Sequence, residues 1–172
     1  MRFHTVIRAQ PNSAHYALAE LETQKDLTLV TQNVDGLHRR AGSIQVLELH
    51  GNITRSRCER CQHLDKLPEG FSVPPQCSSC GHRARPNVVW FGEALPRQVF
   101  KEAVTAFYQA ELALIMGTSA VVEPAASLAR LAKEQGAYLL EINPQLTPLS
   151  QLADCSLAVP AVQGMKLLRG EA

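Results

Sequence analysis

The sequence lacks long apolar runs and any dominant charge. Its longest aliphatic stretch, Leu112–Met116, is far too short to span a bilayer, and the N-terminal residues have no apolar core of signal-peptide length. The 17 Lys and Arg residues nearly balance the 16 Asp and Glu residues, for a formal net charge of +1. This balance gives no electrostatic reason to expect nucleic acid or a membrane as a partner. We therefore expect a cytoplasmic protein.

The size and composition bound the number of domains. The chain has 172 residues, of which 45% are apolar and 19% charged. Such a chain buries a core and matches one domain, or one domain with a small insert. Internal repeats and low-complexity tracts are absent.

Short apolar runs, each followed by polar or small residues, predict the strands. The four runs are Leu27–Val30 before Thr31-Gln32-Asn33, Leu112–Met116 before Gly117-Thr118-Ser119, Tyr138–Ile142 before Asn143, and Ser156–Val159 before Pro160-Ala161. A fifth short strand is predicted at Val46–Leu49, and Val88–Phe91 is expected to return the chain to the main core. Runs that are mainly apolar are typical of strands buried on both faces.

Helical spacing of apolar residues predicts four helices between these strands. The first is capped by Asn12 or Ser13 and ends near Lys25, the second covers Glu102–Gln109, the third runs from Glu123-Pro124 to Gly136, and the last ends at about Leu168. Alternating strands and helices indicate an α/β fold with an open parallel sheet covered on both faces. Ligands of such sheets bind beyond the carboxyl ends of the strands, so the polar strand ends predict one composite pocket.

The stretch Thr31–Gly51 contains the densest chemistry. Gln32, Asn33 and Asp35 fall within four positions, and His50 follows the strand predicted at Val46–Leu49. Taken alone, His50 is more simply a structural histidine, and its Glu-Leu-His-Gly context favours a chemical role instead.

The five cysteines point to a metal. Cys58 and Cys61 form one Cys-x-x-Cys pair, and Cys77 and Cys80 form a second pair after fifteen residues. This spacing is typical of a zinc ion held by four thiolates, a closed set of ligands that makes the metal structural. The segment from Cys58 to Arg85 is poor in apolar residues, so we expect the zinc ion to fold it as a separate lobe. The fifth cysteine, Cys155, is expected to be a small buried hydrophobe.

Six motifs together resemble the sirtuins, the NAD-dependent protein lysine deacylases. They are TQNVDGLHRRAG (31–42), ELHG (48–51), the two cysteine pairs, RPNVVWFGE (85–93), GTSAVVEPAA (117–126) and INP (142–144). They occur in the family's order and cover nearly everything from Pro11 to Ala161. The resemblance implies a Rossmann-like NAD-binding domain at 1–57 and 86–172, with the zinc lobe inserted at 58–85.

The resemblance also implies a role for each matching residue. His50 would be the general base, and an acyl-lysine peptide would be the substrate. The cofactor contacts would be Gln32, Asn33, Val34, Asp35, Gly117, Thr118, Ser119, Asn143 and Ala161. The peptide would pair as a strand with Val89 through Glu93, with contacts at Val89, Phe91, Gly92 and Glu93. The structural zinc ligands would be Cys58, Cys61, Cys77 and Cys80.

The implied chemistry matches these residue types. Carboxamide and carboxylate groups would fix the nicotinamide, and the acyl-lysine oxygen would attack the ribose C1′. A histidine would then remove a proton from a ribose hydroxyl. The products would be free lysine, nicotinamide and O-acyl-ADP-ribose.

One family feature is missing from the sequence. The sirtuins begin with a strand and a Gly-Ala-Gly-x-Ser loop that holds the pyrophosphate, whereas this sequence has no Gly-x-Gly and its first glycine is Gly36. We expect an N-terminally truncated sheet with weak NAD binding, and self-association through the incomplete sheet is one of its expected consequences. Three explanations for the missing loop stay open. The gene start is assigned too late, which we favour; the chain is a fragment that a partner completes; or it is a degenerate relative of the family.

Three functional classes compete at this point. The first is the deacylase, and the second is a non-catalytic, zinc-containing interaction module that has lost NAD turnover. The third is a zinc-ribbon nucleic-acid binder, which is disfavoured because Phe71 is the only aromatic residue of the lobe. Preference for acetyl or succinyl groups stays open: Arg2 is either the arginine of the Tyr-x-x-Arg pair found in the acidic-acyl branch or an exposed terminal residue.

Overall fold

The computed structural model describes residues 3–67 and 74–171. Its elements follow the chain as α1 (Phe3–Arg8), α2 (Ser13–Glu22), β1 (Leu29–Thr31), α3 (Leu37–Arg40), β2 (Val46–Glu48), β3 (Gly51–Cys58), β4 (Leu64–Lys66), β5 (Ala84–Val88), α4 (Arg97–Gln109), β6 (Leu112–Met116), α5 (Ala126–Glu134), β7 (Tyr138–Ile142), β8 (Cys155–Leu157) and α6 (Ala161–Leu168). Arg2 and Phe71 lie outside the described residues, so the expectations that concern them stay predictions.

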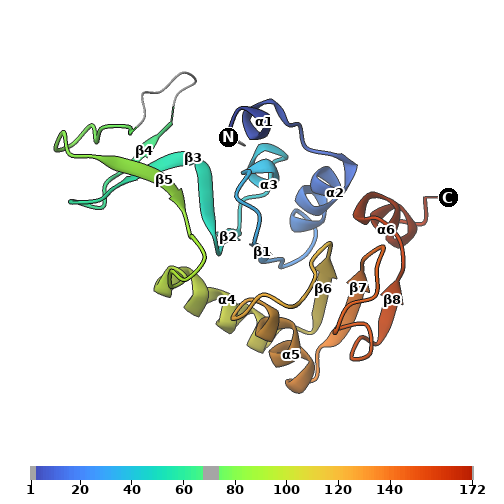
Figure 1. Cartoon of the computed structure of the whole chain (residues 1–172). Coiled ribbons are helices and arrows are strands. Elements are labelled where there is room, and N and C mark those ends of the chain that lie inside the picture. Colours follow the sequence, from blue (N-terminus) through green and yellow to red (C-terminus); the bar gives the residue numbers. More distant parts are fainter. Residues whose placement is uncertain (1–2, 68–73, 172) are drawn as a thin grey trace.

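The parallel strands form two ladders. Strands β1 and β2 pair in parallel, and β6, β7 and β8 form a second parallel ladder with β7 in the middle. Strands β6 and β7 begin and end where the apolar runs predicted, and β1, β2 and β8 lie within two residues of their predicted bounds. The two ladders lie side by side in Figure 1, with helices on either side.

Alternating side chains of β1 and β2 pack against helices on opposite faces. Leu29 and Val46 lie in a cluster with α2 and α6, whereas Val30 and Leu47 pack against a cluster built by α4 and α5. The first cluster also receives side chains from β6, which joins the second ladder to the first. This period of two, with helices on both faces, is the α/β arrangement that the sequence predicts.

Three helix ends differ from their predicted positions. Helix α5 begins at Ala126, because Glu123 and Pro124 form a turn that precedes it and a carboxylate oxygen of Glu123 accepts the N–H of Ser127. Helix α2 ends at Glu22, three residues early, and α4 begins at Arg97, before the predicted Glu102. The predicted cap Asn12 is confirmed, since its Oδ1 accepts the N–H groups of Ala14 and His15.

The remaining strands form an antiparallel sheet in the order β4-β3-β5, which stands apart from the parallel strands at the upper left of Figure 1. Its central strand β3 starts at Gly51, directly after His50, and ends at Cys58. This sheet, with the segment that joins β4 to β5, is called the lobe below. Its strands extend beyond the predicted boundaries at 58 and 85 on the side of the parallel strands.

Helix lengths give one further finding. Among the described residues, no helix combines the length and the apolar character that crossing a membrane requires.

Candidate functional site

His50 lies against the loop that follows β1. Its Nδ1 is 2.9 Å from the backbone oxygen of Gln32. A carbonyl oxygen only accepts hydrogen bonds, so in the neutral ring Nδ1 carries the proton and donates it. The other ring nitrogen, Nε2, therefore holds the lone pair and is the basic atom of His50.

The ends of three parallel strands are joined by hydrogen bonds. Gln32, after β1, donates from Nε2 to Oγ1 of Thr118, after β6, over 3.4 Å. Asn143, after β7, donates from Nδ2 to the backbone oxygen of Thr118 over 2.7 Å. The carboxyl ends of β1, β6 and β7 therefore meet at one edge, and the connection continues through Gln32 to His50, while the composite pocket expected there stays a prediction.

The loop between β1 and α3 carries the other predicted polar residues. Asn33 is exposed, and its N–H donates to Oγ1 of Thr31 over 3.1 Å. The backbone oxygen of Val34 accepts the N–H of Ile53 over 2.8 Å, which ties the loop to β3. Asp35 accepts the N–H of Leu37 through Oδ1 over 3.0 Å, so this partly accessible carboxylate stabilises the turn that leads into α3.

The remaining predicted cofactor residues follow β6 and β8. Gly117 has a φ of +60°, a left-handed conformation that favours glycine, and its N–H donates to the backbone of Ile142 over 3.1 Å. Ser119 is exposed next to Thr118. Ala161 is the first residue of α6 and packs partly buried near α2.

The predicted peptide-binding strand at Val89–Glu93 is not a strand in this structure, because Trp90–Glu93 form a turn. The N–H of Glu93 donates to the backbone oxygen of Trp90 over 3.0 Å, and a Glu93 carboxylate oxygen accepts the N–H of Trp90 over 3.2 Å. Gly92 has a φ of +86°, which closes the turn. The segment still lies beside the site, because the N–H of Val89 donates to the backbone oxygen of His50 over 2.9 Å.

The turn ends in charged and aromatic side chains. Arg85 pairs with both carboxylate oxygens of Glu93, at 2.9 and 3.0 Å. The hydrogen bond from the N–H of Trp90 and, to a smaller extent, the one from Arg85 lower the pKa of the Glu93 carboxyl. Phe91 is fully exposed, and an exposed large aromatic beside a candidate site is a typical contact for a partner.

The four paired cysteines meet in the lobe. The Sγ–Sγ distances are 3.6 Å for Cys58–Cys80, 3.6 Å for Cys61–Cys77 and 3.5 Å for Cys61–Cys80, and all four sulfurs lie within 4.8 Å of one another. Four thiolates bound to zinc at about 2.3 Å in a tetrahedron would stand about 3.8 Å apart, so the arrangement fits zinc. Disulfides are excluded at these distances.

The backbone around Cys58 favours a thiolate. The N–H groups of Cys61 and Arg60 both donate to Cys58 Sγ over 3.4 Å. These hydrogen bonds lower the pKa of Cys58 to about 6, and the bond from Cys61 has the larger effect. A thiolate is the form that binds a metal ion. His63 and His82 are exposed and lie outside the cluster of four sulfurs.

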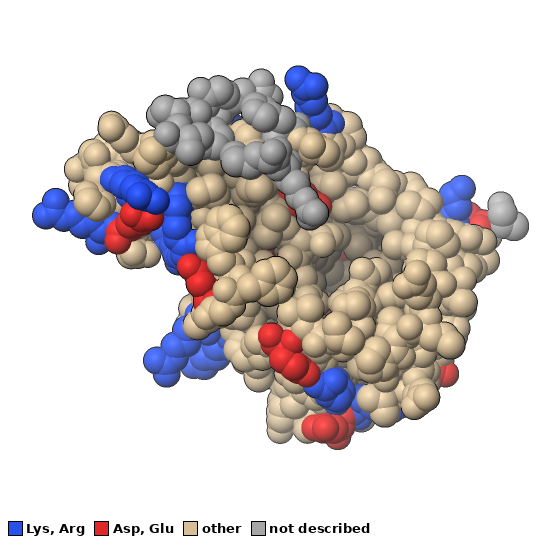
Figure 2. Space-filling model, in the orientation of Figure 1, with Lys and Arg blue, Asp and Glu red and all other residues tan. Residues whose placement is uncertain are grey.

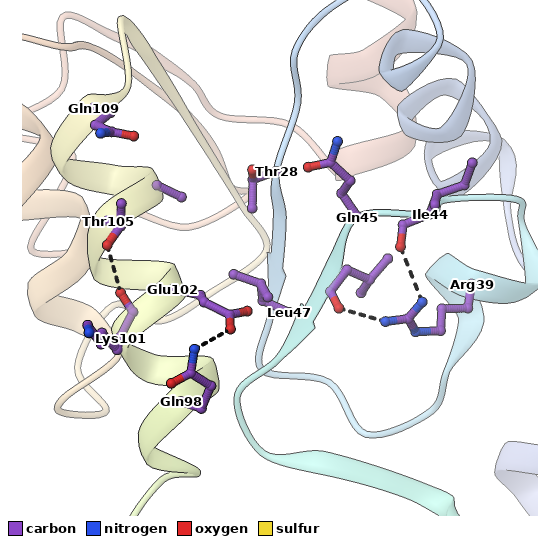
Figure 3. A pocket seen from close by; sticks show the side chains of 12 residues that line it. Thr28, Arg39, Ile44, Gln45, Leu47, Gln98, Lys101, Glu102, Thr105 and Gln109 are labelled. Atoms are coloured by element: carbon purple, nitrogen blue, oxygen red, sulfur yellow. Dashed lines mark hydrogen bonds between the residues drawn. The ribbon is translucent and has the colours of Figure 1, made fainter.

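A separate cavity lies between β2 and α4 (Figure 3). It has a volume of about 530 Å³ and is lined by Thr28, Arg39, Ile44, Gln45, Val46, Leu47, Gln98, Lys101, Glu102, Thr105, Ala106 and Gln109. None of the predicted site residues lines it. Arg39 points along β2 and donates to the backbone oxygens of Ile44 and Val46, so its donors bind the strand and not the cavity (Figure 3).

Charge on the face shown in Figure 2 gathers on the lobe, where blue and red side chains lie next to one another, while the centre of the face is mostly uncharged. Two ion pairs explain part of this mixture, Arg83–Glu59 at 3.5 Å and Arg85–Glu93 at 2.9 Å. On this face, the described residues of the lobe therefore present charges of both signs next to one another.

A buried polar network next to His50 was not predicted. Glu48, the last residue of β2, accepts from Asn52 and Arg55 of β3. Glu48 belongs to the ELHG motif, yet no sequence pattern indicates which donors it meets. The available signal was a charged residue at the end of a buried strand, where a charge needs a partner.

Comparison with known proteins assigns a family to this arrangement. The model of the Sir2 family matches residues 1–124. A protein from Thermus thermophilus named NAD-dependent protein deacylase is 57% identical over 172 residues, which is 97% of this chain and 68% of the relative. A protein of the same name from Aquifex aeolicus is 45% identical over 94% of this chain and 69% of the relative.

Solved structures agree with the sequence relatives. The structure of a Sir2 homologue in complex with NAD is 46% identical and superposes with a TM-score of 0.90, over 96% of this chain and 66% of the other. A structure of Sir2 with a p53 peptide and NAD+ is 36% identical, with a TM-score of 0.89 over 97% of this chain and 72% of the other.

Proposed function

Since the chain belongs to the Sir2 family, we propose that it is an NAD-dependent protein lysine deacylase. The reaction consumes an acylated lysine, NAD and water and yields free lysine, nicotinamide and an O-acyl-ADP-ribose. Acetyl is the acyl group we favour, with succinyl as the alternative. The observation that carries the proposal is the continuous connection of His50, Gln32, Thr118 and Asn143 at the carboxyl ends of the parallel strands.

The residues after β1 would hold the nicotinamide end of NAD. The Gln32 side chain already donates to Thr118, so the carboxamide is oriented before any ligand arrives. Asn33 is exposed, and Val34 and Asp35 are held by Ile53 and Leu37. Gln32, Asn33 and Asp35 thus offer three polar side chains on a loop whose backbone is fixed at both ends.

The residues after β6, β7 and β8 would hold the rest of the dinucleotide. Gly117, Thr118 and Ser119 would face the ribose and phosphates, Asn143 the adenosine ribose and Ala161 the adenine side. The support is their position: parallel strands bring these ends to one edge of the sheet, where such ligands bind. NAD supplies the electrophilic ribose carbon when it is bound.

His50 would act as the general base through Nε2. The bond from Nδ1 to Gln32 leaves Nε2 as the proton acceptor and fixes the plane of the ring. The N–H of Val89 also holds the backbone of His50, so the base is anchored on both sides.

The peptide would bind along Val89–Glu93. Val89 lies beside His50, Phe91 and Gly92 are exposed, and Glu93 is held by Arg85. An extended acyl-lysine peptide that adds to this segment would place the acyl group near the base. The turn would have to open toward an extended conformation for this pairing.

The zinc ion would be held by Cys58, Cys61, Cys77 and Cys80 and would stabilise the lobe without taking part in the reaction. The division of the chain into 1–57 with 86–172 and an inserted lobe at 58–85 belongs to this proposal. Self-association through the sheet stays a prediction.

Calorimetric titration of the zinc-loaded chain with NAD tests the proposal. We expect binding at micromolar to sub-millimolar concentration, and Gln32→Ala should weaken it about tenfold, equivalent to about 1.4 kcal/mol. Gln109→Ala is the matched control, because this exposed glutamine at the end of α4 lies away from the strand ends. His50→Ala should abolish turnover of an acetyl-lysine peptide while NAD binding persists.

A folded, zinc-loaded sample that binds no NAD would contradict the deacylase for this chain. The interaction module that competes with it would then be the better description, provided that the peptide still binds.

A further inference from the structure

The carboxylate of Glu48 lies at the junction of the site and the lobe. Glu48 pairs with Thr31 at the end of the β1–β2 ladder. After Thr31 the chain enters the loop to α3, and after Glu48 it continues to His50. Its side chain is only 10% exposed. A carboxylate with so little water needs fixed partners, because an unpaired buried charge is strongly unfavourable.

Three side chains supply those partners. Asn52 donates from Nδ2 to Glu48 Oε1 over 2.7 Å, and Arg55 donates from Nη2 to Glu48 Oε2. Arg39 of α3 is farther away, with its Nε 3.8 Å from Oε1. Glu48 therefore connects β2 to two residues of β3 and to α3.

Asn52 extends this connection to the candidate nicotinamide loop. Asn52 is buried, and its Oδ1 accepts the N–H and the hydroxyl of Thr54 over 2.9 and 2.7 Å. Its Nδ2 lies 2.9 Å from the point where a Cβ on Gly36 would stand. The glycine, with a φ of +71°, thus lets the loop rest directly on the carboxamide that Glu48 holds.

The same loop is held at two further points, by His50 directly before β3 and by Ile53 within β3. The imidazole of His50 donates to the backbone of Gln32, and the N–H of Ile53 donates to the backbone of Val34. Asn52 lies between His50 and Ile53 in the sequence. Any shift of Asn52 would move the partners of Gln32, Val34 and Gly36 together.

We propose that Glu48, acting through Asn52, is a positioning residue that keeps His50 and the loop 32–36 in the geometry that catalysis needs. The inference rests on the proposed function, in which His50 is the base. In this role Glu48 would touch neither substrate nor cofactor. Its effect is to hold Asn52 against Gly36 and so preserve the bond between His50 Nδ1 and Gln32.

Arg55 makes this role dependent on the charge of Glu48. Its Nε is buried and has no hydrogen-bond partner among the described residues, so the guanidinium depends on Glu48 for compensation. A neutral side chain at position 48 would leave Arg55 partly uncompensated. Arg55 would then turn toward solvent or toward Asn52, and either change disturbs the contact with Gly36.

Nitrogen-15 NMR of the histidine rings tests the proposal without turnover. The chain has six histidines, and His50→Gln assigns the His50 signals by their loss. In the unmodified protein we expect neutral His50 to be protonated at Nδ1 alone. In Glu48→Gln we expect a mixture of the two tautomers, because the bond to Gln32 is no longer enforced.

Glu20→Gln is the matched control. Glu20 makes an ion pair with Arg169 at 2.9 Å on the surface of α2, so the same loss of charge there should leave the His50 tautomer unchanged. Asn52→Ala is the second test: it removes the link to Gly36 but keeps the Glu48–Arg55 pair, and it should produce the same mixture of tautomers.

Steady-state kinetics give the second readout. Glu48→Gln should lower kcat about tenfold and leave KM for the peptide within about twofold, because the altered group is the base and not a binding contact. A lower melting temperature with an unchanged His50 tautomer in both Glu48→Gln and Asn52→Ala would overturn the inference, since it would show a purely structural role. Loss of NAD binding with the expected change of tautomer would contradict the proposed function and leave the positioning role intact.

Discussion

The parallel strands and the lobe are stabilised in different ways. The parallel strands are buried between helices, and side chains such as Leu139 and Ile142 are fully inaccessible. In the lobe, two of the best-buried side chains are the candidate zinc ligands Cys58 and Cys77, and Leu64 of β4 is about half exposed. The comparison teaches that one region is held by apolar packing and the other by four sulfurs, with His50 directly at the boundary where β3 begins.

Zinc removal is expected to have the largest effect on this comparison. Structural zinc sites of this kind contribute about 10–16 kcal/mol to folding. We expect a chelator to remove the hydrogen-exchange protection of amides in β3, β4 and β5, while amides of β7 stay protected and provide the internal control. Hydrogen exchange read by NMR or mass spectrometry measures both regions in one sample. Lobe amides that stay protected in chelator, together with an unchanged melting curve, would contradict the metal assignment.

The sequence predicted the packed region better than the lobe. Strand β6 was found with its bounds because all five of its residues are apolar, and β7 was found because four of its five residues are apolar and Asn143 follows them. The strands of the lobe were not predicted, since the burial pattern of β4 has no apolar alternation and a polar strand looks like a loop. The four cysteines were nevertheless predicted to meet, because ligand spacing is a local property of the sequence.

The sequence indicated which residues belong to the candidate site, but it did not indicate which contacts they make. Parallel topology alone brings the ends of β1, β6 and β7 together, so Gln32, Thr118 and Asn143 could be placed at one edge. The turn at Val89–Glu93 escaped prediction because it depends on Glu93 accepting the N–H of Trp90, a contact that no periodicity reveals. The same holds for the partners of Glu48.

Truncation of a leucine to alanine in each region should have the second-largest effect, and it should differ between the parallel strands and the lobe. Leu139 of β7 is fully buried, and Leu139→Ala should lower the free energy of unfolding by about 2–5 kcal/mol through lost burial and the cavity left behind. Leu64→Ala in β4 removes the same atoms from a side chain that is 49% exposed, so we expect a loss below about 1 kcal/mol. Urea denaturation of the zinc-loaded proteins gives both values. Equal losses at the two positions would remove the distinction between packed and metal-held regions.

The smallest expected effect concerns Glu141, a buried carboxylate in the middle strand β7. Burial raises its pKa, but hydrogen bonds from the hydroxyls of Ser150, Thr147 and Ser156 outweigh burial, so the pKa lies below its ordinary value. A carboxylate whose pKa is lower in the folded than in the unfolded state stabilises the fold above its unfolded pKa of about 4.3, and this contribution is lost as pH falls through the folded value. These three bonds also hold the segment that follows Asn143 against β7.

Glu141→Gln should therefore cost about 1–3 kcal/mol at pH 7, and the difference from the unmodified protein should shrink as pH falls below about 4. The matched change in the lobe is Glu59→Gln, which breaks an exposed ion pair with Arg83 and should cost less than about 0.5 kcal/mol at pH 7. Urea denaturation at pH steps from 7 down to 3 measures both differences. Hydrogen bonds from the three hydroxyls stabilise Glu141 in its charged form, so their contribution should disappear once the carboxylate is protonated. A Glu141→Gln penalty that stays constant or grows in acid would therefore show that the fold does not stabilise the charged form.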